Sequence, residues 1–137
     1  QITTCGERIL VDLTASQQTA PCPTCTALSA KTHAYYQRRV ADLPWAGVPV
    51  QLLLRVRRFV CTADSCLRRT FSEPLPEVVT PAARRSLRLA NEQRQLGLQV
   101  GGNGASRIAH RQGMSVSPAT VLRLLRTTPV PEPKTPA

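Results

Sequence analysis

Two pairs of cysteines are the residues of this sequence best suited to chemistry. Cys22-Pro-Thr-Cys25 is a C-x2-C pair, and Cys61-Thr-Ala-Asp-Ser-Cys66 is a C-x4-C pair. Each pair places two thiolates on one short turn, and Zn2+ in structural sites prefers four such ligands in a tetrahedral array. The spacing therefore predicts a structural zinc site formed by Cys22, Cys25, Cys61 and Cys66, with no open position for catalysis. An iron site with the same four thiolates is the chemical alternative.

Two other roles for these cysteines compete with metal binding. A disulfide within a C-x2-C pair is strained, and nothing in the sequence resembles a secretory signal. Free cysteines in a core are common, but they do not normally occur in closely spaced pairs. Cys5 stands apart from both pairs. A reducing cytoplasm suits both a free thiol and thiolate-bound zinc.

The charge of the chain predicts a nucleic-acid partner. Its 137 residues hold 18 Lys and Arg against 8 Asp and Glu, a formal net charge of +10. Lys31 and Lys134 are the only lysines, so the excess is nearly all arginine, which binds phosphate in a bidentate manner. A merely solvated basic surface is the alternative. No apolar run approaches the roughly 20 residues that span a bilayer, so no membrane segment is expected.

Strand patterns surround the cysteines and predict a small β domain over 1–75. Alternating apolar residues favour strands within 5–16, 33–40 and 48–60, with a turn at 42–47 and a short segment at 68–71. In 48–60, Val50, Leu52, Leu54 and Val56 share one face of the strand, and arginines lie on the other. We expect a small antiparallel zinc ribbon, and we expect loss of the metal to unfold residues 1 to about 75.

Helical periodicity follows a proline-rich segment. We expect a stiff linker at 76–80 and then an all-α helix-turn-helix domain at 81–127. The predicted helices run from Pro81 behind Thr80 to about 100, from 105 to 112, and from Ser117-Pro118 to about 126, with glycines at 101–104 between the first two. The fold class is thus α+β. A plain three-helix bundle is the alternative, and 128–137 is predicted to be a proline-rich tail or linker.

The sequence resembles the bacterial insertion-sequence transposases of the ISL-three family. The resemblance lies in the two cysteine pairs and in four further segments: His33-Ala-Tyr-Tyr-Gln-Arg-Arg39, Asp42-Leu-Pro-Trp45, Arg57-Arg-Phe59 and Arg68-Arg-Thr-Phe-Ser-Glu73. It implies an N-terminal four-cysteine zinc ribbon followed by a helix-turn-helix. It also implies that the protein binds the terminal inverted repeats of a transposon as double-stranded DNA, in the bacterial cytoplasm at the nucleoid. The parent transposase would act as a homo-oligomer.

Family members also carry an RNase-H-like catalytic domain with three acidic residues, and this sequence has no counterpart to it. Such catalysis needs carboxylates that hold two metal ions about 4 Å apart. Asp12, Asp42 and Asp64 all lie in or near the ribbon, and Glu132 is the only acid after Glu92. We therefore expect the chain to bind DNA without cutting or joining it.

Two groups of residues are predicted to contact DNA. In the ribbon they are Arg38, Arg39, Arg55 and Arg57, and in the last helix they are Ser117, Ala119, Arg123 and Arg126. Ion pairs with Asp42, Asp64 or Glu73 are the alternative role for the ribbon arginines. Two other functions stay open at this point: a stand-alone DNA-binding regulator with the same ribbon and helices, and a protein–protein adaptor.

Overall fold

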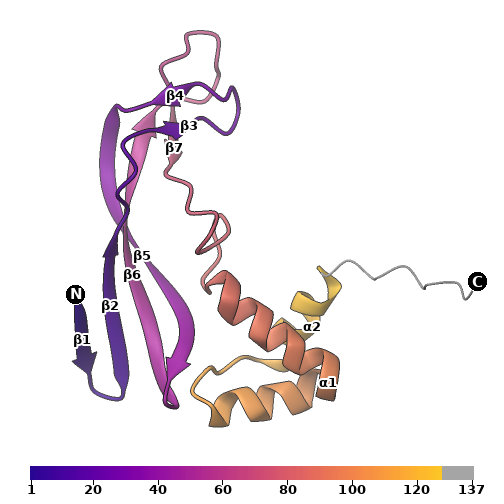
Figure 1. The fold of residues 1–137 in the computed structure, drawn as a ribbon. Coiled ribbons are helices and arrows are strands. Elements are labelled where there is room, and N and C mark those ends of the chain that lie inside the picture. Colours follow the sequence, from indigo (N-terminus) through magenta and orange to yellow (C-terminus); the bar gives the residue numbers. More distant parts are fainter. Residues whose placement is uncertain (128–137) are drawn as a thin grey trace, which may run out of the picture.

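A computed structural model of the chain describes residues 1–127, and the predicted tail at 128–137 lies outside the described residues. The strands are β1 (Ile2–Cys5), β2 (Arg8–Thr14), β3 (Ala20–Pro21), β4 (Leu28–Ser29), β5 (Thr32–Trp45), β6 (Val48–Val60) and β7 (Thr70–Ser72), and the helices are α1 (Leu87–Arg111) and α2 (Pro118–Arg126). Figure 1 shows a tall sheet with the helices beside its lower end.

β6 is the central strand of a five-stranded sheet. β5 pairs antiparallel with one of its edges over nearly the full length, while β2 and β7 pair with successive parts of it. The β2–β6 pair is parallel, so the sheet is mixed and not the antiparallel ribbon that the sequence predicted. The alternating residues of β6 form the main core as predicted: Val50, Leu52, Leu54 and Val56 are all buried.

The hairpin between β5 and β6 has a much tighter turn than the predicted 42–47 segment. β5 continues to Trp45, and only Ala46 and Gly47 turn the chain, with φ angles of 50° and 80°. Positive φ at both central residues is the backbone that a two-residue turn between twisted strands requires. The strand can pass through Pro44 because the ladder is irregular between Asp42 and Trp45.

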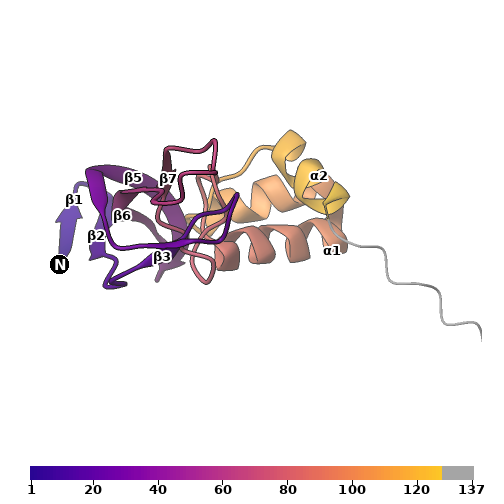
Figure 2. The ribbon, with the colours of Figure 1, turned by 90° about the horizontal axis from the view of Figure 1, so that it is seen from above.

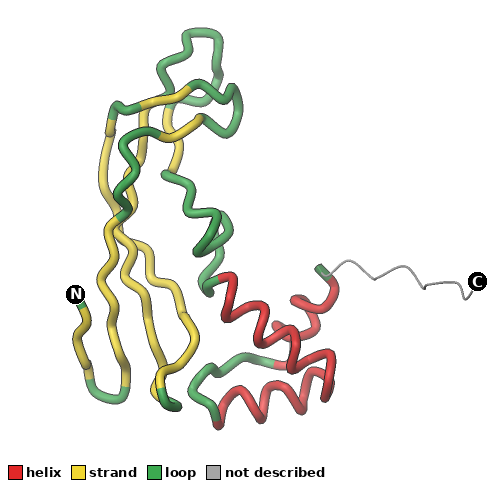
Figure 3. Tube along the Cα trace, viewed as in Figure 1, coloured by secondary structure: helices red, strands yellow, loops and turns green. Residues whose placement is uncertain are grey.

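The proline-rich segment after β7 packs along the core face of the sheet. Val79 is buried in the same cluster as the β6 residues, and Leu75 and Ala83 lie partly buried against it. Figure 3 shows this loop running beside the strands from β7 to α1. The residues predicted as a linker, 76–80, therefore contribute to the core, while the domain boundaries themselves stay a prediction.

The predicted all-α helix-turn-helix domain is wrong. The described chain is mostly β, and it has two helices in place of three. The backbone is still irregular at Pro81, and α1 starts only after Ser86, whose side chain accepts a hydrogen bond from the Leu89 backbone N–H. The predicted break at the glycines is present: Gly101 (φ 75°, ψ 178°) is not helical, and it divides α1 into two helical segments. The expected α+β class with a separate helical domain is therefore wrong, and the described chain has a mostly β fold with two helices.

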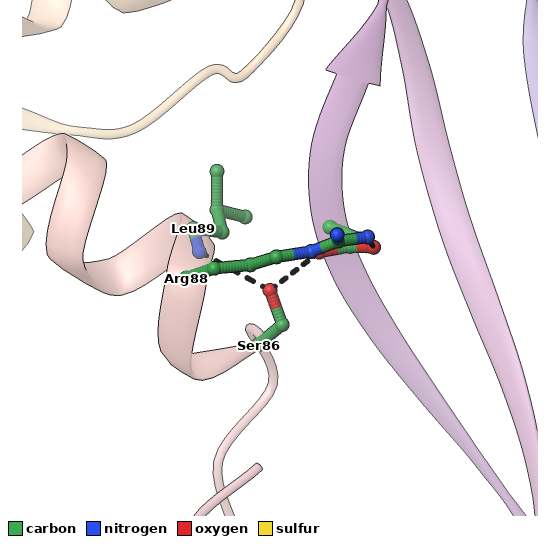
Figure 4. A network of polar contacts seen from close by, with 4 residues as sticks. Ser86, Arg88 and Leu89 are labelled. Carbon is green, nitrogen blue, oxygen red and sulfur yellow. Dashed lines mark hydrogen bonds and ion pairs between the residues drawn. The ribbon is translucent and has the colours of Figure 1, made fainter. Parts of the chain in front are cut away.

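The helices contact the end of the sheet near β5. Leu43 of β5 packs on the helical cluster of Leu89, Ala105, Ala109, Met114, Val116 and Val121. In Figure 4 the Arg88 side chain extends from α1 to β5, where its guanidinium binds Asp42. Figure 2, seen from above, shows the helices projecting away from the sheet.

Candidate metal centre and nucleic-acid interface

The first cysteine pair lies on a small hairpin formed by β3 and β4. The Cys22 backbone N–H donates to the Ala27 carbonyl at 2.9 Å, and the Thr26 N–H donates to the Cys22 carbonyl at 2.8 Å. Thr26 has a φ of 65°, a left-handed conformation that reverses the chain just after Cys25. Both sulfurs of the pair are thus held on one turn, as the spacing predicted.

The second cysteine pair connects β6 to β7. Its turn is closed by hydrogen bonds from the Cys61 N–H to the Arg69 carbonyl at 2.9 Å and from the Cys66 N–H to the Ala63 carbonyl at 3.2 Å. Behind both pairs lies a small core in which Phe59 and Phe71 stack with ring centroids 5.7 Å apart. This core brings the end of β6 and the short strand β7 under the two cysteine turns.

The four sulfur atoms converge at one point. They all lie within 4.8 Å of one another; the Cys22 and Cys66 sulfurs are 3.9 Å apart and those of Cys25 and Cys61 are 3.5 Å apart. Zinc with bonds near 2.3 Å holds tetrahedral sulfurs about 3.8 Å apart. A disulfide would bring two sulfurs to about 2.05 Å. The sulfur atoms therefore fit a structural zinc ion, and all four cysteines are free.

The thiols differ strongly in acidity. Burial raises the pKa of Cys22, but hydrogen bonds from the backbone of Cys25 and Thr24 outweigh it and lower the pKa to about 6. A backbone hydrogen bond at Ala63 lowers the pKa of Cys61, but burial and the neighbouring thiols outweigh it and raise the pKa to about 12. A backbone hydrogen bond at Arg68 lowers the pKa of Cys66, but burial and the Cys25 thiol together outweigh it and raise the pKa. A bound dication must therefore displace protons from this group.

Two of the four predicted ribbon arginines have partners within the protein. Arg57 forms a bidentate ion pair with Glu73, with Nη2 to Oε1 at 2.8 Å and Nε to Oε2 at 3.1 Å. Its side chain is only 16% exposed. Arg38 donates from Nη2 to the Ala83 carbonyl at 2.8 Å. Both arginines thus bind the 73–83 segment. For Arg57, the partner Glu73 is one of those named in the ion-pair alternative.

Arg39 and Arg55 are exposed and lie on the face of the sheet opposite the core residues Leu54 and Val56. In the β5–β6 register, Arg39 is opposite Leu53 and Gln37 is opposite Arg55. Arg39 and Arg55 are therefore diagonal neighbours on the same face, close enough to contact one ligand together. The guanidinium of Arg55 lies 4.6 Å from the ring centroid of Tyr35, and both border a hollow of about 450 Å³.

The predicted residues of the last helix lie at the surface. Ser117 caps α2 by accepting a hydrogen bond from the Thr120 N–H at 3.2 Å, and it also donates to the Thr120 hydroxyl at 2.9 Å. Ala119, Arg123 and Arg126 are exposed and recur at helical spacing along one side of α2. Whether they contact DNA stays a prediction.

The sequence analysis missed two features that bear on function. The sequence analysis considered the buried Asp42 as a partner for ribbon arginines and as one of the acids that form no catalytic triad, whereas it binds Arg88 and Ser86 at the start of α1. Arg107, His110 and Arg111 border a hollow before α2. The sequence holds one sign of this basic hollow, which is the lack of any acidic residue between Glu92 and Glu132.

Comparison with known proteins shows that the segment holding the metal centre is similar to a transposase zinc finger. Residues 18–66 match the family model described as the zinc-finger of transposase IS204/IS1001/IS1096/IS1165. The match contains all four cysteines and ends before the helices. This similarity supports structural zinc and a nucleic-acid-binding role. No curated protein and no solved structure matches the chain. Neither α1 nor α2 is both long and apolar enough to cross a membrane.

Proposed function

We propose that this chain is a DNA-binding portion of a transposase that recognises the end sequences of its element. The observation that carries the proposal is the convergence of four cysteines inside a segment that matches a transposase zinc finger. In this proposal the metal fixes the upper end of the sheet, and exposed arginines supply the contacts to double-stranded DNA.

The distribution of charge supports a polyanionic partner. Among residues 1–127, ion pairs join only Arg57 to Glu73 and Arg88 to Asp42. The remaining exposed arginines therefore have no acidic partner in the described chain. Each phosphate that such an arginine neutralises releases counterions, which makes binding strongly dependent on salt.

The face that we propose for the ribbon is the one bearing Arg39 and Arg55. Their guanidiniums are exposed and diagonal to one another, whereas Arg38 and Arg57 are held by Ala83 and Glu73. Tyr35 beside Arg55 is 53% exposed and adds an aromatic surface to the same face. On α2 we propose contacts by Ser117, Ala119, Arg123 and Arg126.

We propose that the chain binds DNA without cutting it. The two buried acids, Asp42 and Glu73, are each committed to an arginine. In the part of the chain that the structure describes, one group of three or more potential metal ligands occurs, and it consists of the four cysteines. Incubation with Mg2+ and the bound duplex should leave the DNA intact, and a specific nick would overturn this part of the proposal.

Selection from randomised duplex DNA with zinc-loaded protein tests the proposal. We expect enrichment of a defined sequence, and we expect that sequence to occur at the ends of an element encoding the protein. Arg39→Gln/Arg55→Gln should reduce the salt slope of binding by about two, since each neutralised phosphate adds about 0.9. Arg8→Gln/Arg84→Gln removes two other exposed charges and is the matched control.

A protein partner at the metal end is the second candidate function. Leu67 is 98% exposed and Leu28 is 68% exposed, and both are next to or near cysteines of the centre. Exposed leucines at one end favour an apolar contact over a phosphate contact. Absence of duplex binding at low salt, together with self-association that Leu67→Ser abolishes, would favour this role over DNA binding.

A further inference from the structure

A second basic site lies at the junction of the two helices. A hollow of about 510 Å³ is bordered by Ser106, Arg107, His110 and Arg111 from α1, and by Ser115 and Ser117 from the segment that leads to α2. In Figure 1 this segment returns from the end of α1 toward α2. The hollow is separate from both the metal centre and the exposed face of the sheet.

Internal hydrogen bonds fix the walls of this hollow. The Ser106 hydroxyl donates to the Val116 carbonyl at 2.7 Å, which holds the connecting segment against α1. Nδ1 of His110 lies 3.0 Å from the Ser115 hydroxyl oxygen across the same gap. The connecting segment is further anchored where the Gln93 amide donates to the Met114 carbonyl at 3.0 Å. These hydrogen bonds therefore hold the polar groups that line the hollow in fixed positions.

Two arginines extend from one side of this surface. Arg107 and Arg111 are four residues apart on α1, so their side chains occupy the same face, and both are exposed. Like charges at this spacing repel each other, which disfavours the arrangement unless an anion is present. The dipole at the end of α1 favours Arg111 in the last turn, but it does not account for Arg107 one turn earlier.

No acidic side chain borders the hollow, and none occurs anywhere between Glu92 and Glu132. The positive charge of the two guanidiniums is therefore not balanced by neighbouring residues of the described chain. Guanidinium groups bind phosphate oxygens through paired hydrogen bonds, and hydroxyl and imidazole groups complete such sites. The guanidinium, imidazole and hydroxyl groups that line the hollow are thus suited to binding a phosphate group.

We propose that this hollow binds backbone phosphates of the DNA, with Arg107 and Arg111 as the principal ligands and His110 and Ser115 beside them. This inference rests on the proposed DNA-binding function and adds a third contact region to it, next to α2 at Ser117. The chain would then hold DNA at the ribbon face, along α2 and at the helical junction, and the junction would contribute affinity that does not depend on base sequence.

The test measures duplex affinity of the full zinc-loaded chain as a function of salt. Arg107→Gln/Arg111→Gln should reduce the slope of log affinity against log salt by about two, because two phosphate contacts are lost. The reduction should be equal for specific and unrelated duplexes. The control Arg8→Gln/Arg84→Gln removes the same charge from exposed positions outside the hollow and should leave the slope within half a unit of the wild type.

The outcomes separate this inference from the function on which it rests. If the wild-type chain binds no duplex, the proposed function fails. If it binds and both double variants keep the wild-type slope, or both lower it equally, the hollow is not the contact and this inference alone is wrong. Zinc content and circular dichroism of each variant verify that it is folded.

A second measurement identifies the source of the phosphate. The His110 imidazole signals, assigned by comparison with His110→Gln, should shift when duplex DNA is added to the full chain. Inorganic phosphate at equal ionic strength should produce a much smaller shift. A shift with inorganic phosphate and none with duplex would make the hollow a site for free anions and would overturn the proposal.

Discussion

Asp42 keeps its negative charge in a place where burial opposes it. The residue is 3% exposed, and burial raises the pKa of its carboxyl. Hydrogen bonds from Arg88 and Ser86, with Nε at 2.7 Å and Oγ at 2.6 Å from Oδ1, outweigh that effect and lower the pKa below its ordinary value. The carboxylate thereby links β5 to the first turn of α1.

The Asp42→Asn substitution should destabilise the protein by about 1–3 kcal/mol at neutral pH, since it weakens a buried charge-assisted network. Because the folded pKa is lowered, the carboxylate contributes stability above the unfolded pKa near 4. That contribution is lost as the pH falls through the folded value. Urea unfolding between pH 2 and 7 should show that, below about pH 4, the free energy of unfolding of Asp42→Asn changes less with pH than that of the wild type. The exposed Asp12→Asn is the control, and an unchanged profile for Asp42→Asn would contradict the prediction.

Cys61→Ser should abolish stoichiometric zinc binding, because a hydroxyl is a poor replacement for a thiolate ligand. Metal analysis after gel filtration measures this directly. Cys5→Ser is the matched control, since Cys5 is exposed and outside the group of four. Zinc affinity should also fall as the pH is lowered, because protons compete for the sulfurs. A Cys61→Ser protein that retains one zinc ion would contradict the assignment.

Individual residues were predictable from the sequence where local spacing determines their role. The four cysteines are such a case, because two short turns leave the sulfurs few other positions. The roles of arginines were not predictable in the same way, because the partner of a long side chain depends on which residues the tertiary fold brings near it. Arg57 meets Glu73 only because β7 pairs with the end of β6, a contact that no local pattern encodes.

At the scale of elements, one close approach joins the helices to the β5–β6 hairpin. Gly113, after α1, has a φ of 81°, and a Cβ there would clash with the carbonyl oxygen of Gly47 in the hairpin turn. Glycine at this position thus serves both a left-handed backbone and the contact between two elements.

Gly113→Ala should reduce the free energy of unfolding by about 2 kcal/mol or more, since it combines a left-handed alanine with a steric clash. Gly6→Ala is a matched control: Gly6 also has positive φ, 59°, but a Cβ there meets nothing within 4 Å. The control should lose only about 1–2 kcal/mol. Equal losses in the two variants, measured by denaturant unfolding, would show that the approach to Gly47 is not significant.

Strand positions were easier to predict than helix starts. The apolar alternation in 48–60 indicated β6 correctly because burial on one face dictates that pattern. Thr80-Pro81 has a good local signature for a helix start, yet α1 begins at Leu87. Ala41 accounts for the difference: its N–H binds the Arg84 carbonyl and its carbonyl accepts from the Ser86 N–H, so the sheet holds this stretch extended.

The whole molecule contains three small cores in series. The cluster around Phe59 and Phe71 lies beneath the metal centre, the Val50–Val56 cluster lies along the sheet, and the helical cluster lies near the hairpin turn. The order follows from the register of β6, whose Val60 end leads to Cys61 and whose Val48 end leads to the turn. The sequence did not reveal that β2 joins this sheet parallel to β6, because that pairing brings together residues far apart in the chain.

Removal of zinc should therefore unfold the molecule from one end, and not over the whole of residues 1–75. The core under the cysteines is small, and structural zinc supplies roughly 10–16 kcal/mol of apparent binding free energy to such sites. The clusters along the sheet and around the helices do not contain the cysteines, so they keep their apolar contacts without the ion.

Amide hydrogen exchange before and after chelation measures this difference. We expect protection to be lost at 20–29 and 60–72, where the metal holds β3, β4 and β7 together, while the amides of 50–56 and of α1 stay protected. Cys61→Ser should show the same pattern without chelator and should not respond further to it. Uniform loss of protection across β6 and α1 would mean that the three cores unfold as one unit. In that case the contacts between neighbouring clusters, such as Asp42 with Arg88, transmit the effect of the metal to the far end of the sheet.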